Sequence, residues 1–230
     1  MNLREKFKNN IFYYANVIEN PQEIIDMVER LDTYPGSYST IPKWEDWKTS
    51  NDDGVLFGKK KDINIKNLDT VQEELGKDVL HIANTIGNAI ERVTHAFYSD
   101  MGKEGYPEYS KGLRVSKYLT GASMGPHYDV MDGNSKIEYS VLIYYNDNYD
   151  GGEVSFMISE EDMLSESYTG VRLPLDGSDP FVAENADLFI KPEAGSALIF
   201  PSIKPYYHQV HLLRGGEKYI SPGFIYKNSQ

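Results

Sequence analysis

The segment "IEYSVLIYYNDNYDGGEVSFMI", residues 137–158, contains two runs of β-branched and aromatic residues. A stretch rich in Asn, Asp and Gly, "NDNYDGG" (146–152), separates them. Runs of this kind are typical of strands, and such polar stretches form the turns between them. The segment therefore predicts two neighbouring strands of an antiparallel sheet.

Similar runs recur along the chain. We expect further strands over residues 10–18, 113–119, 195–202, 206–213 and 217–226. Helices are expected over residues 19–31, which begin with Asn20 and Pro21, and over residues 69–98, where apolar residues recur at helical spacing. No helix-length segment alternates with the C-terminal strands, which argues against a βαβ fold.

The predicted fold class is therefore α+β and mainly β: a double-stranded β-helix, or jelly roll, with supporting helices near the N-terminus. We expect a single domain over residues 1–230. Within it, residues 1–112 would form a helical and loop support region, and residues 113–230 the jelly-roll core. The polar residues 159–190 are expected to form an insertion between strands. Residues 33–66 look irregular, and Trp44 and Trp47 there either pack onto the core or form a wall or lid of a cleft.

The composition excludes several classes of function. The formal net charge is −12 over 230 residues, and a field of that sign repels phosphate backbones, so nucleic acid is not expected as a partner. The chain has no cysteine, which excludes disulfides, thiolate metal sites and a cysteine nucleophile. The N-terminus lacks the apolar segment of a signal peptide, and no stretch reaches the roughly 18 apolar residues that cross a bilayer. We expect a soluble cytoplasmic protein with no membrane partner.

A candidate metal site lies in "MGPHYDVMDG" (124–133), where His127 and Asp129 are two residues apart. On a strand, side chains at i and i+2 point to the same face, so both could bind one metal ion. The pattern is common by chance, and it could equally belong to a solvated strand edge. A third ligand would have to come from a distant strand, and downstream only His208 and His211 offer an imidazole.

The segment "YYHQVHLLRGGEKY" (206–219) favours His208. Lys218 follows it by ten residues with a Gly-Gly turn between, so we expect a hairpin that brings the ammonium group toward a metal bound by His208. Two histidines and one carboxylate on a metal leave open positions for a co-substrate and dioxygen, as in non-haem iron(II) oxygenases. The lysine could then bind the far carboxylate of a keto diacid. His211 has the opposite strand parity and is expected at the surface or behind the ligands.

Together these motifs resemble the 2-oxoglutarate/iron(II)-dependent dioxygenases, in their prolyl 4-hydroxylase-like branch. The matching segments are "SKYLTGASMGPHYD" (116–129), "SVLIYYNDNYDGGEVSF" (140–156), "KPEAGSALIFPS" (191–202) and "HQVHLLRGGEKY" (208–219). The resemblance implies that His127, Asp129 and His208 bind iron(II) and form the catalytic centre. It also implies 2-oxoglutarate as co-substrate and dioxygen as oxidant, with ascorbate as a further candidate cofactor.

The same resemblance assigns the co-substrate pocket. Lys218 and Tyr144 would bind the far carboxylate of 2-oxoglutarate, and Tyr118 would line the pocket, with a packing role as its alternative. Tyr145 has the opposite strand parity to Tyr144 and is expected in the core. Glu153 in the Gly-Gly-Glu turn is expected to be structural, and Asp132 a turn residue rather than a ligand.

The expected activity is hydroxylation of an aliphatic carbon, with release of succinate and carbon dioxide. The family points to a peptidyl proline as the first substrate to test. However, the arginine that the branch carries before its Tyr-x-Asn strand falls at Ile137, beside Lys136, and its tryptophan on the last strand falls at about Phe224. Both positions are associated with peptide recognition, so a free amino acid or other small molecule is the alternative substrate. An alternative of another class is a non-catalytic jelly-roll binding module with structural histidines.

Overall fold

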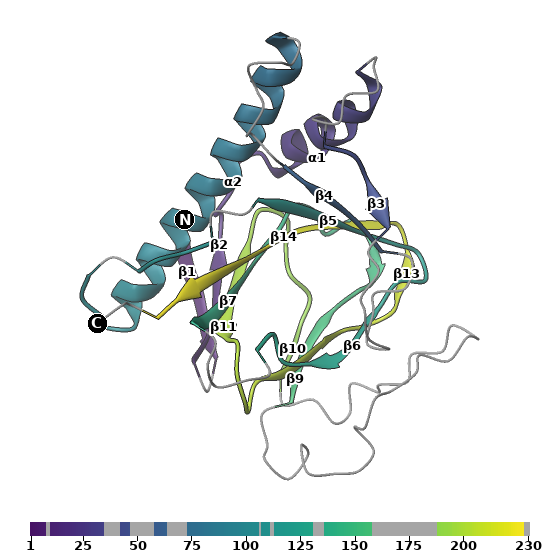
Figure 1. Cartoon of the computed structure of the whole chain (residues 1–230). Coiled ribbons are helices and arrows are strands. Elements are labelled where there is room, and N and C mark those ends of the chain that lie inside the picture. Colours follow the sequence, from purple (N-terminus) through teal and green to yellow (C-terminus); the bar gives the residue numbers. More distant parts are fainter. Residues whose placement is uncertain are drawn as a thin grey trace.

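The structure is a computed structural model that describes residues 1–7, 10–34, 42–46, 58–63, 73–105, 107–110, 113–130, 136–157 and 188–227 (Figure 1). Trp47, Asp132 and residues 159–187 of the expected insertion lie outside these ranges.

The larger sheet has eight strands and combines segments from both halves of the chain. All neighbouring strands in it are antiparallel. In spatial order they are β1 (Asn2–Phe7), β2 (Ile11–Ala15), β11 (Ala197–Pro201), β7 (Ile137–Tyr144), β14 (Glu217–Tyr226), β5 (Arg114–Leu119), β4 (Gly58–Asp62) and β3 (Glu45–Asp46). The region before residue 113 therefore supplies strands to both edges of this sheet, as well as helices.

A second sheet faces the first (Figure 1). Its order is β10 (Leu188–Ile190), β9 (Val154–Met157), β12 (Tyr207–Val210) and β6 (Met124–His127), again antiparallel. A short pair, β8 (Asp150–Gly151) with β13 (Leu213–Gly215), lies where the chain passes between the sheets. Two facing antiparallel sheets confirm the predicted fold class, a mainly β jelly roll with N-terminal helices.

The helices cover the outer face of the eight-stranded sheet (Figure 1). They are α1 (Pro21–Arg30), the short 3₁₀ turn η2 (Leu31–Thr33) and α2 (Glu73–Asp100). Pro21 stands at the first helical position, where its fixed φ suits the helix and its missing N–H removes no bond. Among the described residues, no helix is long and apolar enough to cross a membrane.

Strand alternation divides the buried side chains into two cores. Tyr145 belongs to the core between the eight-stranded sheet and the helices, where its hydroxyl donates a hydrogen bond to Ser221 Oγ over 2.7 Å. Tyr144 belongs to the core between the two sheets. The opposite parity expected for these two tyrosines is confirmed, and it places Tyr144 in the interior of the jelly roll.

Part of the segment expected to be irregular, residues 33–66, forms strands β3 and β4. The sequence of β4, "GKKKD", shows no apolar alternation, so its strand conformation comes from pairing with β5 rather than from local preference. Trp44 packs against the core between the eight-stranded sheet and the helices, which is one of the two roles expected for it. Its ring lies 4.7 Å from the Lys61 ammonium and 5.0 Å from that of Lys117.

Candidate active site

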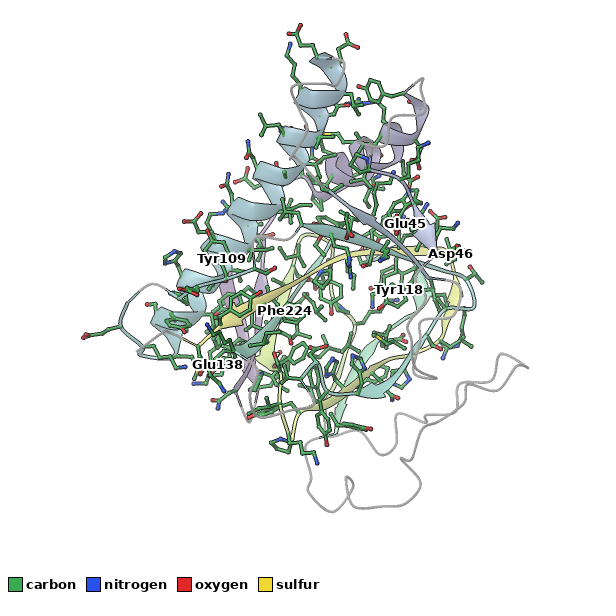
Figure 2. The ribbon with its side chains drawn as sticks, in the orientation of Figure 1. Glu45, Asp46, Tyr109, Tyr118, Glu138 and Phe224 are labelled. Atoms are coloured by element: carbon green, nitrogen blue, oxygen red, sulfur yellow. The ribbon has the colours of Figure 1, made fainter. Side chains whose placement is uncertain are left out.

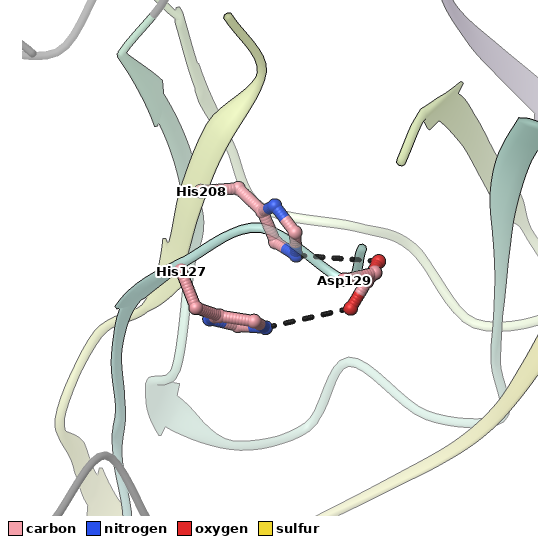
Figure 3. A group of neighbouring side chains, drawn as sticks. All are labelled: His127, Asp129 and His208. Atoms are coloured by element: carbon pink, nitrogen blue, oxygen red, sulfur yellow. Dashed lines mark ion pairs between the residues drawn. The ribbon is translucent and has the colours of Figure 1, made fainter. Parts of the chain in front are cut away.

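The three expected metal ligands lie together at one end of the smaller sheet (Figure 3). His127 on β6 and His208 on β12 are register partners, and their ring centroids are 4.3 Å apart. Asp129 follows β6 and turns its carboxylate toward both rings: Oδ1 lies 3.6 Å from His127 Nε2, and Oδ2 lies 3.7 Å from His208 Nε2. One ligand atom from each residue lies within 4.8 Å of the other two, and no other such group occurs in the described part of the chain.

Backbone contacts fix which imidazole nitrogen faces the site. His127 Nδ1 lies 2.8 Å from the Gly125 carbonyl, and His208 Nδ1 lies 3.2 Å from the Tyr206 carbonyl. A carbonyl only accepts, so each Nδ1 carries the proton and each Nε2 carries the lone pair. In this tautomer each Nε2 can bind a metal ion while the protein holds the second ring nitrogen.

The protonation states also suit a metal. Burial, together with the neighbouring His127, lowers the pKa of His208 to about 4, so its imidazole is neutral at pH 7. Burial alone would raise the pKa of Asp129, but the two histidines and a hydrogen bond from Ser140 outweigh it and hold that pKa below its usual range. Two imidazoles and one carboxylate are the donor set of a non-haem iron(II) site, so these residues fit that metal.

His211 lies away from this group. It is buried, and its Nε2 lies 2.9 Å from Ser155 Oγ and 3.2 Å from Gln209 Nε2. Ser155 and Gln209 alternate with the inward-facing residues of β9 and β12, so this contact lies on the outer face of the smaller sheet. The expected difference in direction from His208 is therefore present, but His211 is not a surface residue.

Lys218 occupies a fully buried position at the start of β14. Its Nζ donates to the Gly152 carbonyl over 2.6 Å. Three tyrosine rings surround the ammonium group, with ring centres 5.3 Å away for Tyr144 and 5.6 Å for both Tyr118 and Tyr149. Burial lowers the pKa of Lys218 to about 7, although the charge of Glu153 acts in the opposite direction.

Two polar atoms beside this lysine lack hydrogen bonds. The hydroxyls of Tyr144 and Tyr149 are buried and have no partner among the described residues. A buried polar group without a partner costs roughly 1–3 kcal/mol. One buried cation and two buried hydroxyls without partners among the described residues fit a carboxylate, which could accept hydrogen bonds from all three.

The route by which Lys218 reaches the interior differs from our expectation. The prediction that the strands of His208 and Lys218 form a hairpin is wrong, because β12 lies in the smaller sheet and β14 in the larger one. The chain changes sheets between them through β13, and the turn at Gly216, with φ +84°, joins β13 to β14. Lys218 therefore enters the interior from the sheet opposite His208.

Strand β7 connects the two ends of the site. Ser140, Leu142 and Tyr144 alternate along its inner face, with Ser140 hydrogen-bonded to Asp129 and Tyr144 beside Lys218. Phe156, Phe200 and Ile220 are among the apolar side chains of the core between them. The interior thus offers metal ligands at one end, a cation at the other and apolar walls between, which matches a keto diacid with a methylene middle.

The remaining expected positions lie on the larger sheet. Tyr118 lies on β5 (Figure 2) and is the register partner of Lys218. Its hydroxyl lies 3.8 Å from Met124 Sδ. Ile137 begins β7, and Phe224 on β14 is the register partner of Ser140. Phe224 therefore lies on the inner side of the sheet, next to the serine that contacts Asp129.

Sequence reasoning missed three residues of the site: Ser140, Ser202 and Tyr149. Ser140 shares its strand parity with Tyr144, so parity could have placed it in the interior. Tyr149 belongs to the "NDNYDGG" turn, whose composition gives no sign that one of its side chains is buried. Ser202 follows the end of β11 and carries no sequence signal that we recognise.

The comparisons agree with this geometry. The family model of the 2OG-Fe(II) oxygenase superfamily matches residues 113–226, about half of the chain, and the chain belongs to this superfamily. The protein is thus a 2-oxoglutarate-dependent non-haem iron(II) dioxygenase, an enzyme that uses iron(II), 2-oxoglutarate and dioxygen. This membership argues against the alternative of a non-catalytic binding module. No curated protein matches the sequence.

Several solved structures share the fold. A prolyl hydroxylase from Trichoplax adhaerens, in complex with a peptide fragment of the hypoxia inducible factor oxygen degradation domain, is 16% identical with a TM-score of 0.56, over 95% of this chain and 84% of that one. A Pseudomonas putida prolyl-4-hydroxylase is 14% identical with a TM-score of 0.53, over 96% and 95%. A viral collagen prolyl hydroxylase from Paramecium Bursaria Chlorella virus-1, solved with 2OG, is 14% identical with a TM-score of 0.52, over 95% and 96%.

Proposed function

We propose that the protein hydroxylates a peptidyl proline, with iron(II) held by His127, Asp129 and His208. The observation that carries the site assignment is the arrangement along β7, where the inner face leads from the Asp129 contact at Ser140 to the Lys218 pocket at Tyr144. The chemistry supplied by bound iron(II) and 2-oxoglutarate is the activation of dioxygen, with release of succinate and carbon dioxide and transfer of one oxygen atom to an aliphatic carbon.

The residues of the chain bind and orient 2-oxoglutarate. Lys218 pairs with the far carboxylate of 2-oxoglutarate, Tyr144 donates a hydrogen bond to the same group, and Tyr118 covers the pocket from β5. The apolar walls exclude water from the space between carboxylate and metal.

We also propose that residues 1–230 act as one domain, because strands from the region 1–112 pair with strands of the 113–230 core.

Support for a peptide substrate comes from the prolyl hydroxylases that share this fold, one of which was solved with a bound peptide fragment. Ile137 and Phe224 favour the second candidate, a free amino acid or other small molecule, because the branch carries arginine and tryptophan at these positions. The two candidates share the metal and the co-substrate and differ only in what reaches the metal end of the interior.

Succinate formation separates these candidates. The purified protein would be incubated with iron(II), 2-oxoglutarate and air, together with proline-containing peptides or with free amino acids. We expect succinate to rise with a peptide and the peptide to gain one oxygen atom by mass. Succinate stimulated only by a free amino acid would replace the peptide assignment with the second candidate. Asp129→Ala serves as the control that should form none.

A further inference from the structure

A pair of buried serines lies behind the carboxylate of Asp129. Ser140 Oγ donates a hydrogen bond to Asp129 Oδ2, and Ser202 Oγ lies 2.7 Å from Ser140 Oγ. The two serine residues are 1% and 0% exposed. Ser140 lies on β7 and Ser202 directly follows β11, and both strands belong to the larger sheet. Asp129 follows β6 of the smaller sheet, so the serines connect the two sheets.

The direction of these hydrogen bonds follows from the charge of Asp129. An ionised carboxylate only accepts, so the single proton of the Ser140 hydroxyl is used toward Asp129. The Ser202 hydroxyl must then donate to Ser140. The chain of donors therefore runs from Ser202 through Ser140 to one oxygen of Asp129.

Backbone bonds hold the same region. The Ser202 carbonyl accepts a hydrogen bond from the N–H of Val130, the residue after Asp129, over 3.1 Å. The Ser202 N–H donates to the Glu138 carbonyl on β7, also over 3.1 Å. Ser202 therefore connects the backbone beside Asp129 to the strand that carries Ser140, which fixes the position of the carboxylate from two sides.

We propose that Ser140, supported by Ser202, is a positioning residue that occupies one oxygen of Asp129 and so presents the other oxygen to iron(II). A carboxylate that binds through both oxygens would take a further coordination position. The keto acid and dioxygen need the positions that the three ligands leave open. The hydroxyl of Ser140 thus keeps the metal open for them. The inference rests on the proposed role of Asp129 as a ligand.

The test compares single-atom deletions at two buried serines. Ser140→Ala removes the donor, and Ser140→Thr restores a hydroxyl at the same place. Ser116→Ala is the matched control, because Ser116 is equally buried on β5 but its hydroxyl has no hydrogen-bond partner among the described residues. Affinity for Mn(II), used as an air-stable probe, is measured from the electron paramagnetic resonance signal of the free ion.

We expect Ser140→Ala to weaken Mn(II) binding by about 10–100-fold, the usual effect of losing a group that orients a ligand. Ser140→Thr should recover most of that affinity, and Ser116→Ala should match the parent. Ser202→Ala should reduce Mn(II) affinity less than Ser140→Ala does. The double variant should bind Mn(II) as well as Ser140→Ala alone, because Ser202 acts through Ser140.

Each other outcome counts against a specific claim. Parent-like Mn(II) binding by Ser140→Ala would overturn the inference and leave the metal site intact. Equal losses in Ser140→Ala and Ser116→Ala, with lowered melting temperatures, would show a general packing effect and overturn it too. A folded parent that binds no Mn(II) would overturn the proposed metal site, and the inference with it.

Discussion

Lys218 and Tyr144 meet inside the jelly roll, with the ammonium group 5.3 Å from the centre of the tyrosine ring and the tyrosine hydroxyl without a hydrogen-bond partner among the described residues. Lys218 Nζ donates to the Gly152 carbonyl, and no described carboxylate forms an ion pair with it. The pair is arranged for a ligand that brings a negative charge.

Lys218→Ala should raise the dissociation constant for 2-oxoglutarate at least about a hundredfold. Breaking a buried ion pair costs roughly 3–5 kcal/mol, and about 1.4 kcal/mol corresponds to a factor of ten. Lys218→Arg should lose less because the charge remains. Tyr144→Phe should lose least, since it removes one neutral hydrogen bond worth about 1 kcal/mol. Calorimetric titration with 2-oxoglutarate in the presence of Mn(II) measures all three. Unchanged binding by Lys218→Ala would mean that the carboxylate lies elsewhere.

Binding of 2-oxoglutarate should depend on pH above 7. Burial lowers the pKa of Lys218 to about 7, so above that pH the free enzyme increasingly holds a neutral amine. The bound carboxylate requires the ammonium form, so binding takes up a proton and the affinity should fall by up to about tenfold per pH unit. Below pH 7 the lysine is already charged, and the affinity should level off with respect to this group. Lys218→Arg is the control, because its guanidinium stays charged throughout. The same slope in both proteins would assign the effect to another group.

Loss of any one metal ligand should abolish turnover. His127→Ala, Asp129→Ala and His208→Ala are each expected to bind Mn(II) poorly and to form no succinate. His211→Ala should retain metal binding, but its buried contact with Ser155 would be lost, at a cost of roughly 1–3 kcal/mol of unfolding free energy. An inactive His211→Ala that folds normally, beside an active His208→Ala, would reverse the ligand assignment.

Two glycine substitutions should have opposite effects on stability. Gly151 has φ +74°, and a Cβ there would lie 2.1 Å from the Leu212 carbonyl oxygen. Gly151→Ala should therefore cost at least about 1–3 kcal/mol of unfolding free energy. Gly87 lies within α2 with nothing within 4 Å of an added Cβ, so Gly87→Ala should stabilise the protein by about 0.5–1 kcal/mol. Urea unfolding of both variants checks the signs, and a destabilised Gly87→Ala would contradict the helix argument.

The direction of a side chain on a strand can be predicted from the sequence, because strand parity is a local property. Alternation predicted that Tyr144 and Tyr145 face opposite sides of their strand, and the structure places Tyr144 in the core between the sheets and Tyr145 in the core beside the helices. The third ligand was inferred from the spacing of His208 and Lys218 and from the likeness to a family. The register between β6 and β12 joins residues 81 positions apart, from His127 to His208. Local sequence preferences do not determine such a register.

Other features were missed for the same physical reason. The lysine-rich strand β4 forms because β5 offers a partner, and Lys61 is buried where its ammonium can donate to the Val28 carbonyl over 2.8 Å. The expected hairpin failed because sequence distance does not show which sheet a strand joins. Ser202 reaches Ser140 because β11 pairs with β7, which brings together two serines that lie 62 positions apart in the sequence.

The central claim is that one interior holds iron(II) and 2-oxoglutarate together, and an anaerobic titration tests it most directly. Iron(II) is added to the protein in the presence of 2-oxoglutarate, and the visible absorption spectrum is recorded. We predict a weak metal-to-ligand charge-transfer band for the parent protein, no band for Asp129→Ala, and a band for Lys218→Ala only at much higher 2-oxoglutarate concentration. A correctly folded parent that shows no band at saturating iron(II) and 2-oxoglutarate would contradict the account.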